Sequence, residues 1–166
     1  MLTQGLRFDV NCSILFTELP LLKRPAAARA AGFGAVEFWW PFGGPVPGDR
    51  EVDAFIGALA DAGVQLALLN FVGGDMAAGE RGLLSLPEGS AAFRANIDVC
   101  AGIAARTGCT ILNALYGPGR ARHGRAGLRA AVRSARHPGL RRLDRLRVQA
   151  AGSGGQLDEL RLEGAR

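Results

Sequence analysis

One sequence pattern recurs three times along this chain and limits its possible folds more than any other feature. A helix-like stretch ends at a glycine and an apolar stretch begins directly after it, in AAGFGAVEF (30–38), DAGVQLALL (61–69) and RTGCTILNA (106–114). Glycine commonly ends helices because it adopts the left-handed backbone conformation without steric cost. Strands that alternate with helices pair in parallel through right-handed crossovers. The repeat therefore predicts an α/β fold around a parallel sheet.

The hydrophobic pattern predicts four strands and three helices in the first part of the chain. Strands are expected at 8–15, 35–40, 64–70 and 110–115, and helices at 19–32, 49–63 and 90–108. The helix at 49–63 is the clearest, because its apolar residues recur every three or four positions; they are Val52, Phe55, Ile56, Leu59 and Ala60. The helix at 90–108 is expected to bury Phe93, Ile97, Cys100, Ala101 and Ala104.

Polar residues stand at the ends of three expected strands, as Glu37, Asn70 and Asn113. The carboxyl ends of parallel strands meet at one edge, and closed (β/α)8 barrels build their active sites there. No Gly-x-Gly-x-x-Gly motif follows the first strand, which argues against an open dinucleotide-binding sheet. The pattern therefore favours a barrel whose mouth carries these polar side chains.

The composition changes abruptly after residue 117. Residues 1–117 hold eight basic and eleven acidic residues, for a net charge of −3, and all eleven aromatic residues of the chain. Residues 118–166 hold twelve arginines and four acidic residues, for a net charge of +8. A segment without large rings has little to bury in a core. We therefore divide the chain into a folded part, 1–117, and an arginine-rich tail, 118–166, that is poorly ordered or helical.

Three interpretations of the tail remain open. Its arginine, glycine and alanine content is typical of GC-rich coding sequence read out of frame, and this is the interpretation we favour. A basic nucleic-acid-binding arm is the second, although stacking aromatic residues and known motifs are missing. The third is a short amphipathic helix that packs on the folded part, with an apolar face formed by Leu140, Leu143, Leu146 and Ala150.

Cysteine usage and hydropathy bear on the compartment of the protein. Cys12, Cys100 and Cys109 are widely spaced, so they predict neither a disulfide framework nor a zinc site, and we expect buried, reduced thiols. No apolar run approaches the roughly 20 residues of a membrane span, and the start of the chain does not resemble a secretory signal. We therefore expect a cytoplasmic protein without membrane contact.

Three stretches resemble the N-terminal half of hydroxypyruvate isomerases, which are xylose isomerase-like TIM barrels. They are NCSILFTELPLLKRPAAARAAGFGAVEFWWPF, LALLNFVGGDMAAGERGLLSLP and FRANIDVCAGIAARTGCTILNALYG, and the resemblance covers about residues 8–117. It implies an aldose–ketose isomerisation between hydroxypyruvate and tartronate semialdehyde. The substrate would be a small hydroxy or keto acid, and the full-length enzymes would use a divalent metal, Mg²⁺ or Mn²⁺.

The resemblance also implies a set of substrate-binding residues at the barrel mouth and in the loop after the third strand: Asn11, Glu37, Asn70, Glu80, Arg81 and Asn113. Each has a structural alternative, since asparagines at strand ends satisfy backbone groups and Glu80 with Arg81 can form a solvated loop pair. The catalytic glutamates and metal-binding carboxylates of the family lie on later strands. No residue of this chain is assigned to those roles.

Size sets the last expectation. A (β/α)8 barrel takes about 250 residues, so the matching part supplies a partial barrel of about four parallel strands with three helices. Its open edges favour homo-oligomers or aggregates. We expect a chain that is inactive and binds no metal by itself; the alternative is a non-catalytic remnant or interaction module with a nucleic-acid-binding tail.

Overall fold

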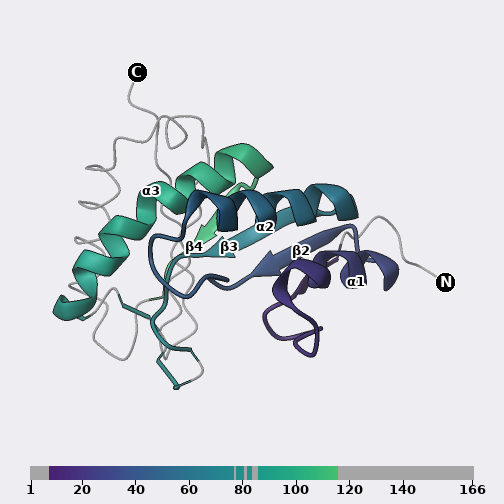
Figure 1. Ribbon diagram of the computed structural model, residues 1–166. Coiled ribbons are helices and arrows are strands. Elements are labelled where there is room, and N and C mark those ends of the chain that lie inside the picture. Colours follow the sequence, from purple (N-terminus) through teal and green to yellow (C-terminus); the bar gives the residue numbers. More distant parts are fainter. Residues whose placement is uncertain (1–7, 77, 81, 84–85, 116–166) are drawn as a thin grey trace.

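The computed structural model describes residues 8–76, 78–80, 82–83 and 86–115 (Figure 1). Four parallel strands form one sheet in the order β1-β2-β3-β4. Their bounds are β1 Asp9–Asn11, β2 Ala35–Phe38, β3 Gln65–Asn70 and β4 Ile111–Asn113. The helices are α1 Arg24–Ala30, α2 Asp49–Ala62 and α3 Ser90–Thr107, and the 3-10 turns are η1 Leu21–Lys23 and η2 Pro87–Gly89. The prediction of four parallel strands with three helices is confirmed.

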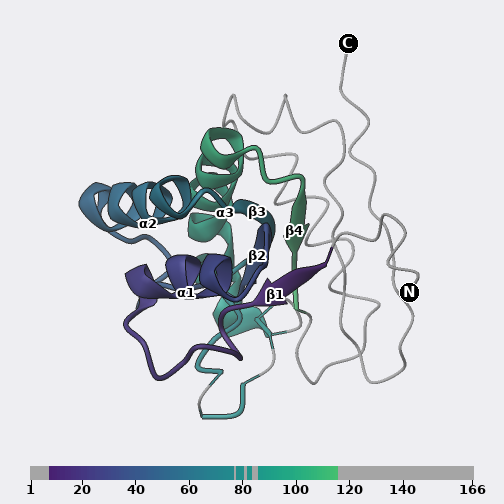
Figure 2. The same cartoon turned by 90° about the vertical axis from the view of Figure 1, so that its right-hand side faces the viewer.

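The three helices cover one face of the sheet, which Figure 2 shows most clearly. The core between these layers contains the fully buried Phe38, Phe55, Leu69, Ile97 and Leu112. No helix of the described part of the chain is long and apolar enough to cross a membrane. The predicted tail, 118–166, lies outside the described residues.

The glycine stops are confirmed in all three places. Gly32, Gly63 and Gly108 follow α1, α2 and α3 with φ values of +95°, +63° and +71°. At the end of α2 the N–H of Gly63 donates to the carbonyls of Ala60 and Leu59. An L-residue would be strained in this left-handed conformation. The glycines therefore end each helix where the following strand must begin.

The predicted element ends needed correction in some places. The first strand ends at Asn11 rather than at residue 15, because the N–H groups of Ile14 and Leu15 both donate to the Asn11 carbonyl. This turn leaves both side chains more than half exposed. Ala60 is exposed, so the buried face of α2 is narrower than its pattern predicted. The five residues expected to be buried on α3 are all buried.

The three cysteines are buried and free, as predicted. Burial raises the pKa of the Cys12 and Cys109 thiols to about 11, and it also raises the pKa of Cys100. A thiol needs to lose its proton to act as a nucleophile. At neutral pH these cysteines therefore serve as small apolar core residues.

Candidate functional site

Four of the six predicted substrate-binding residues lie on the sheet face opposite the helices, in two pairs. The Asn11 amide donates to the Glu37 carboxylate at 3.5 Å, and β1 and β2 place these residues in register. The Asn113 amide donates to the Asn70 side-chain oxygen at 3.1 Å, between β3 and β4. The Asn113 side-chain oxygen is buried and has no partner among the described residues. We call the sheet face opposite the helices the inner face. It thus presents hydrogen-bonding groups on the side away from the helices.

A bulge in β3 decides which side chains reach this face. Val36 pairs with Leu66 but Glu37 pairs with Leu68, so Ala67 is an extra residue in β3. Side chains alternate between the two faces of a strand. The extra residue therefore places both Leu66 and Leu69 in the core and turns Asn70 to the inner face.

Glu37 shares its surroundings with a second acid, Asp9, which sequence analysis missed. The pKa of Glu37 is raised above its ordinary value of 4.5, first by burial and then by the charge of Asp9 and a hydrogen bond to it. The hydrogen bond from Asn11 opposes the rise in part. Asp9 lies two residues before Asn11 and therefore on the same face of β1. The alternation of side chains along this strand could have identified Asp9 as a neighbour of Glu37.

The raised pKa gives a prediction about pH. The folded chain holds the Glu37 proton more tightly than the unfolded chain, so this residue favours folding below pH 4.5 and loses that contribution as pH rises through the folded pKa. We expect Glu37→Gln to remove this decline of the free energy of unfolding with rising pH. At pH 7–8 the free energy of unfolding should rise by less than about 1 kcal/mol, since solvent screens a half-buried charge. Urea unfolding from pH 4 to 8 measures it. Glu18→Gln, at an exposed position, should keep the wild-type slope, and an unchanged slope in Glu37→Gln would refute the assignment.

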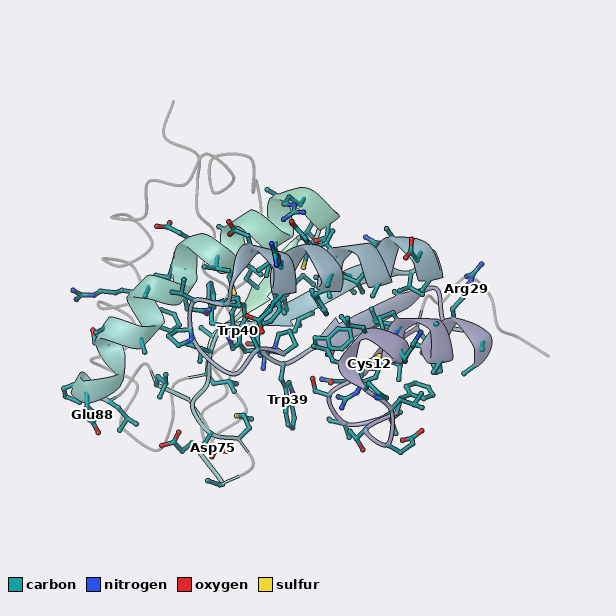
Figure 3. The ribbon with its side chains drawn as sticks, viewed as in Figure 1. Cys12, Arg29, Trp39, Trp40, Asp75 and Glu88 are labelled. Carbon is teal, nitrogen blue, oxygen red and sulfur yellow. The ribbon has the colours of Figure 1, made fainter. Side chains whose placement is uncertain are left out.

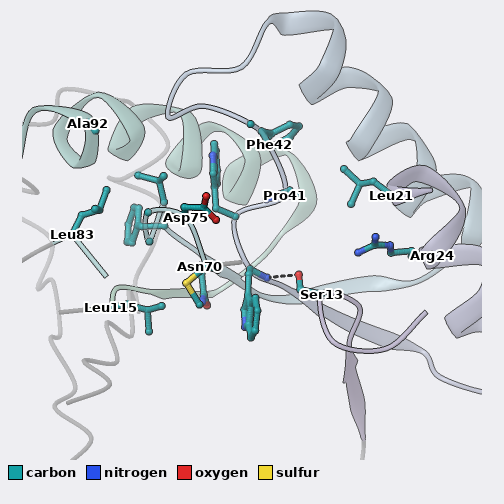
Figure 4. A pocket seen from close by; sticks show the side chains of 18 residues that line it. Ser13, Leu21, Arg24, Pro41, Phe42, Asn70, Asp75, Leu83, Ala92 and Leu115 are labelled. Atoms are coloured by element: carbon teal, nitrogen blue, oxygen red, sulfur yellow. Dashed lines mark hydrogen bonds between the residues drawn. The ribbon is translucent and has the colours of Figure 1, made fainter. Parts of the chain in front are cut away.

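A cleft of about 620 Å³ opens at the carboxyl ends of β2, β3 and β4 (Figure 4). Its walls are mainly aromatic and aliphatic, and the polar side chains among its described lining residues are Ser13, Arg24, Asn70 and Asp75. Small-molecule sites commonly combine apolar walls with a few convergent polar groups. Of the predicted site residues that the structure describes, Asn70 alone lines this cleft, and it links the cleft to the inner face of the sheet.

The two tryptophans both line the cleft but they lie differently. Trp40 packs against the core, with its ring edge-to-face to Phe42 at 5.0 Å and its indole N–H on the Gly44 carbonyl at 2.7 Å. In Figure 3 the Trp39 side chain extends downward, below Trp40. Trp40 therefore fixes one wall of the cleft to the core.

Asn96 of α3 ties two loops of the mouth together and was missed by sequence analysis. It is fully buried, accepts the Val72 N–H at 2.8 Å and donates to the Pro45 carbonyl at 2.8 Å. The loop after β2 and the loop after β3 are thus attached to one helix. The sequence contained one signal for the role of Asn96: it is a polar residue on the expected buried face of the helix at 90–108.

Glu80 lies in the loop after β3, where its carboxylate accepts the Asp75 N–H at 2.5 Å. The Gly82 N–H donates to the Gly73 carbonyl at 2.9 Å, which brings the two sides of this loop together. Arg81 lies outside the described residues. A substrate contact for Glu80 and Arg81 therefore stays a prediction, and the observed contact of Glu80 shapes the loop itself.

Gly74 offers a direct test of that loop. Its φ of +85° is left-handed, and a Cβ there would overlap the Glu80 carboxylate. We expect Gly74→Ala to open the loop at a cost of about 1–2 kcal/mol in backbone strain, detected as faster proteolysis between residues 73 and 83. Gly43→Ala is the matched control, because a Cβ at Gly43 meets nothing within 4 Å. Equal cleavage of the two variants would contradict the proposed contact.

The described residues do not form a metal centre. They contain no group of three or more histidine, cysteine or acidic side chains that could hold a metal ion. The inner face offers the carboxylates of Asp9 and Glu37 beside the amides of Asn11, Asn70 and Asn113. Two carboxylates fall short of a group of three, so no catalytic step is assigned to a metal held by the described residues.

Comparison with known proteins reveals a family. The family model of the xylose isomerase-like TIM barrel matches residues 25–149. The chain is 62% identical over 113 residues to a Streptomyces coelicolor protein provisionally named hydroxypyruvate isomerase, a match that covers 67% of this chain and 40% of the relative. It is 45% identical over 92 residues to the 2-oxo-tetronate isomerase of Cupriavidus necator, covering 55% of this chain and 33% of the relative.

A solved structure supports the same fold. The chain resembles the AP endonuclease, family 2, from Brucella melitensis, with a TM-score of 0.64 and 28% identity, over 86% of this chain and 54% of that one. The four strands and three helices are therefore a part of a TIM barrel. The chain spans about two fifths of the length of the hydroxypyruvate isomerase relative it matches.

Proposed function

The chain belongs to the xylose isomerase-like TIM barrel family, and we propose that it is the N-terminal part of an isomerase that interconverts hydroxypyruvate and tartronate semialdehyde. The observation that carries the proposal is the 62% identity to the Streptomyces coelicolor relative. The resemblance to a 2-oxo-tetronate isomerase supports the same substrate class, a small acid with a carbonyl and adjacent hydroxyl groups.

The described residues suit substrate binding better than proton transfer. Isomerisation of hydroxypyruvate removes a proton from C3 and returns one to C2 through an enediol, which needs a positioned acid–base group. The inner face offers the amides of Asn11, Asn70 and Asn113, and each amide can donate and accept hydrogen bonds. We propose that these residues and Glu37 hold the substrate's oxygen atoms. The Glu80–Arg81 loop would cover the substrate, while proton transfer and the Mg²⁺ or Mn²⁺ of the family would need residues beyond the described ones.

We also propose a division of the chain at residue 117, into an isomerase segment, 1–117, and a basic segment, 118–166. The change of composition supports this boundary. The family model extends to residue 149, so its match continues 32 residues past the boundary. Reading the nucleotides beyond codon 117 in the other two frames tests the out-of-frame interpretation.

Turnover assays test the proposed function. We expect the full chain with Mg²⁺ or Mn²⁺ to isomerise hydroxypyruvate no faster than the buffer control. A chimera in which residues 8–115 replace the matching segment of the Streptomyces coelicolor relative should turn over hydroxypyruvate. This chain would then supply the substrate-binding residues, and the rest of the relative would supply the residues for proton transfer and metal binding. The intact relative is the positive control. A chimera that folds but shows no turnover, beside an active relative, would refute the proposal.

A further inference from the structure

The cleft contains one cationic side chain among its described lining residues, Arg24 at the start of α1. Its guanidinium is held by three backbone carbonyls, with Nε on Leu19 at 3.0 Å, Nη1 on Cys12 at 3.0 Å and Nη2 on Thr17 at 3.5 Å. It forms no ion pair with any residue in the described ranges. A fixed positive charge at the cleft is thus without a counter-charge from this part of the chain.

The loop from β1 to α1 is shaped around this guanidinium. Its carbonyls at positions 12, 17 and 19 converge on Arg24, and Phe16 within it adopts a φ of +62°. Bulky L-residues rarely take this left-handed conformation, and such outliers concentrate at binding and catalytic sites. A loop that accepts this strain holds the arginine in one orientation.

Arg24 keeps donors for a ligand. A guanidinium has five N–H groups, and the three carbonyl contacts leave one N–H on each terminal nitrogen. Two N–H groups are what a carboxylate takes in a two-point contact, the geometry in which arginine binds carboxylates most strongly.

Two other donors line the same cleft. The Ser13 hydroxyl oxygen accepts the Trp39 N–H at 2.9 Å, and its own proton has no acceptor among the described residues. The Asn70 side-chain oxygen is used by Asn113, which leaves the Asn70 amide N–H groups for a ligand. Asp75 is the one carboxylate among the described lining residues, and in Figure 4 it lies apart from Arg24, beyond Pro41.

We propose that Arg24 binds the carboxylate of the substrate and so selects small 2-oxo and 2-hydroxy acids over neutral sugars of the same size. The acid end would lie at Arg24 and the hydroxyl end would reach toward Asn70. This inference rests on the proposed function for the nature of the reaction, but the recognition of a carboxylate can be tested without turnover.

Calorimetry with the full chain tests the proposal, with D-glycerate as the acidic probe and glycerol as its neutral counterpart. We expect the wild type to bind glycerate at least tenfold more tightly than glycerol, and to lose this preference as salt screens the charge. Arg24→Met should weaken glycerate binding by about tenfold or more, since a charge-assisted hydrogen bond is lost. Arg29→Met removes the same charge from an exposed position of the same helix, away from the cleft (Figure 3), and should leave binding unchanged.

A second measurement covers the case in which Arg24→Met fails to fold. In the wild type, the Nε–H signal of Arg24 in the NMR spectrum should shift on addition of glycerate and stay in place with glycerol. Failure of the folded wild type to bind glycerate, equal binding of the two probes, or glycerate binding that leaves this signal in place would each overturn the proposal.

The outcomes separate this inference from the proposed function. If glycerate binds through Arg24 while the chimera is inactive, the carboxylate site stands and the isomerase proposal fails. If the chimera turns over hydroxypyruvate and Arg24→Met leaves its KM unchanged, the isomerase proposal stands and the carboxylate site is refuted.

Discussion

Replacing Asn96 by leucine should lower the free energy of unfolding by about 3–5 kcal/mol, because two backbone polar groups lose their partner at once. The Val72 N–H and the Pro45 carbonyl each contact the Asn96 amide at 2.8 Å, and Asn96 itself is fully buried. Leucine has the same branching pattern and a larger volume, so the substitution leaves no cavity, and any overpacking adds to the loss of the hydrogen bonds. The two loops at the cleft should also separate, since Asn96 attaches both of them to α3.

Urea unfolding followed by tryptophan fluorescence measures this loss. Asn96→Asp keeps an acceptor for the Val72 N–H but faces the Pro45 carbonyl with a second acceptor, so we expect it to destabilise the fold as well. Ala95→Leu adds the same side chain at the neighbouring exposed position of α3 and should change stability by less than about 0.5 kcal/mol. If Asn96→Leu were as stable as Ala95→Leu, the loops would not depend on this side chain.

Phe55→Ala should cost about 3–5 kcal/mol, the range for removing a fully buried phenylalanine. The Phe55 ring of α2 is fully buried and meets Phe38 edge-to-face at 5.2 Å and Phe42 at 5.6 Å. Phe42 in turn contacts Trp40 in the wall of the cleft. The cavity should therefore loosen the cleft wall as well as the core.

Phe8→Ala is the matched control for this substitution, because the Phe8 side chain is 66% exposed. It should change the free energy of unfolding by less than about 0.5 kcal/mol. The wavelength of tryptophan emission should shift to the red in folded Phe55→Ala and stay unchanged in Phe8→Ala. A loss below about 1 kcal/mol in Phe55→Ala would mean that the helix layer does not depend on this aromatic cluster.

Local features of the fold were predictable from the sequence. The three glycine stops and the buried face of α3 were correct, because helical periodicity and the left-handed preference of glycine act within a few residues. The first strand shows the limit of such patterns. Its alternation continues to Ile14, yet the strand ends at Asn11 because the following N–H groups turn back onto the Asn11 carbonyl.

The candidate site was predictable in part. The polar residues at the strand ends do lie at one edge of the sheet, since parallel strands place their carboxyl ends together. The pairing of Asn70 with Asn113 depends on the β3 bulge, which no pattern in the sequence marks. A shift of one residue moves every later side chain to the opposite face, and the bulge makes that shift.

By itself, the sequence determined the order of the strands and helices, where each helix ends and which polar residues close the strands. Only the tertiary structure decided the register of β3, the partners of Asn96 and the presence of Arg24 in the cleft. The physical reason is distance along the chain: Arg24 is held by a carbonyl 12 residues away and Asn96 by one 51 residues away. Contacts of that kind follow from how whole elements pack, which local propensity does not encode.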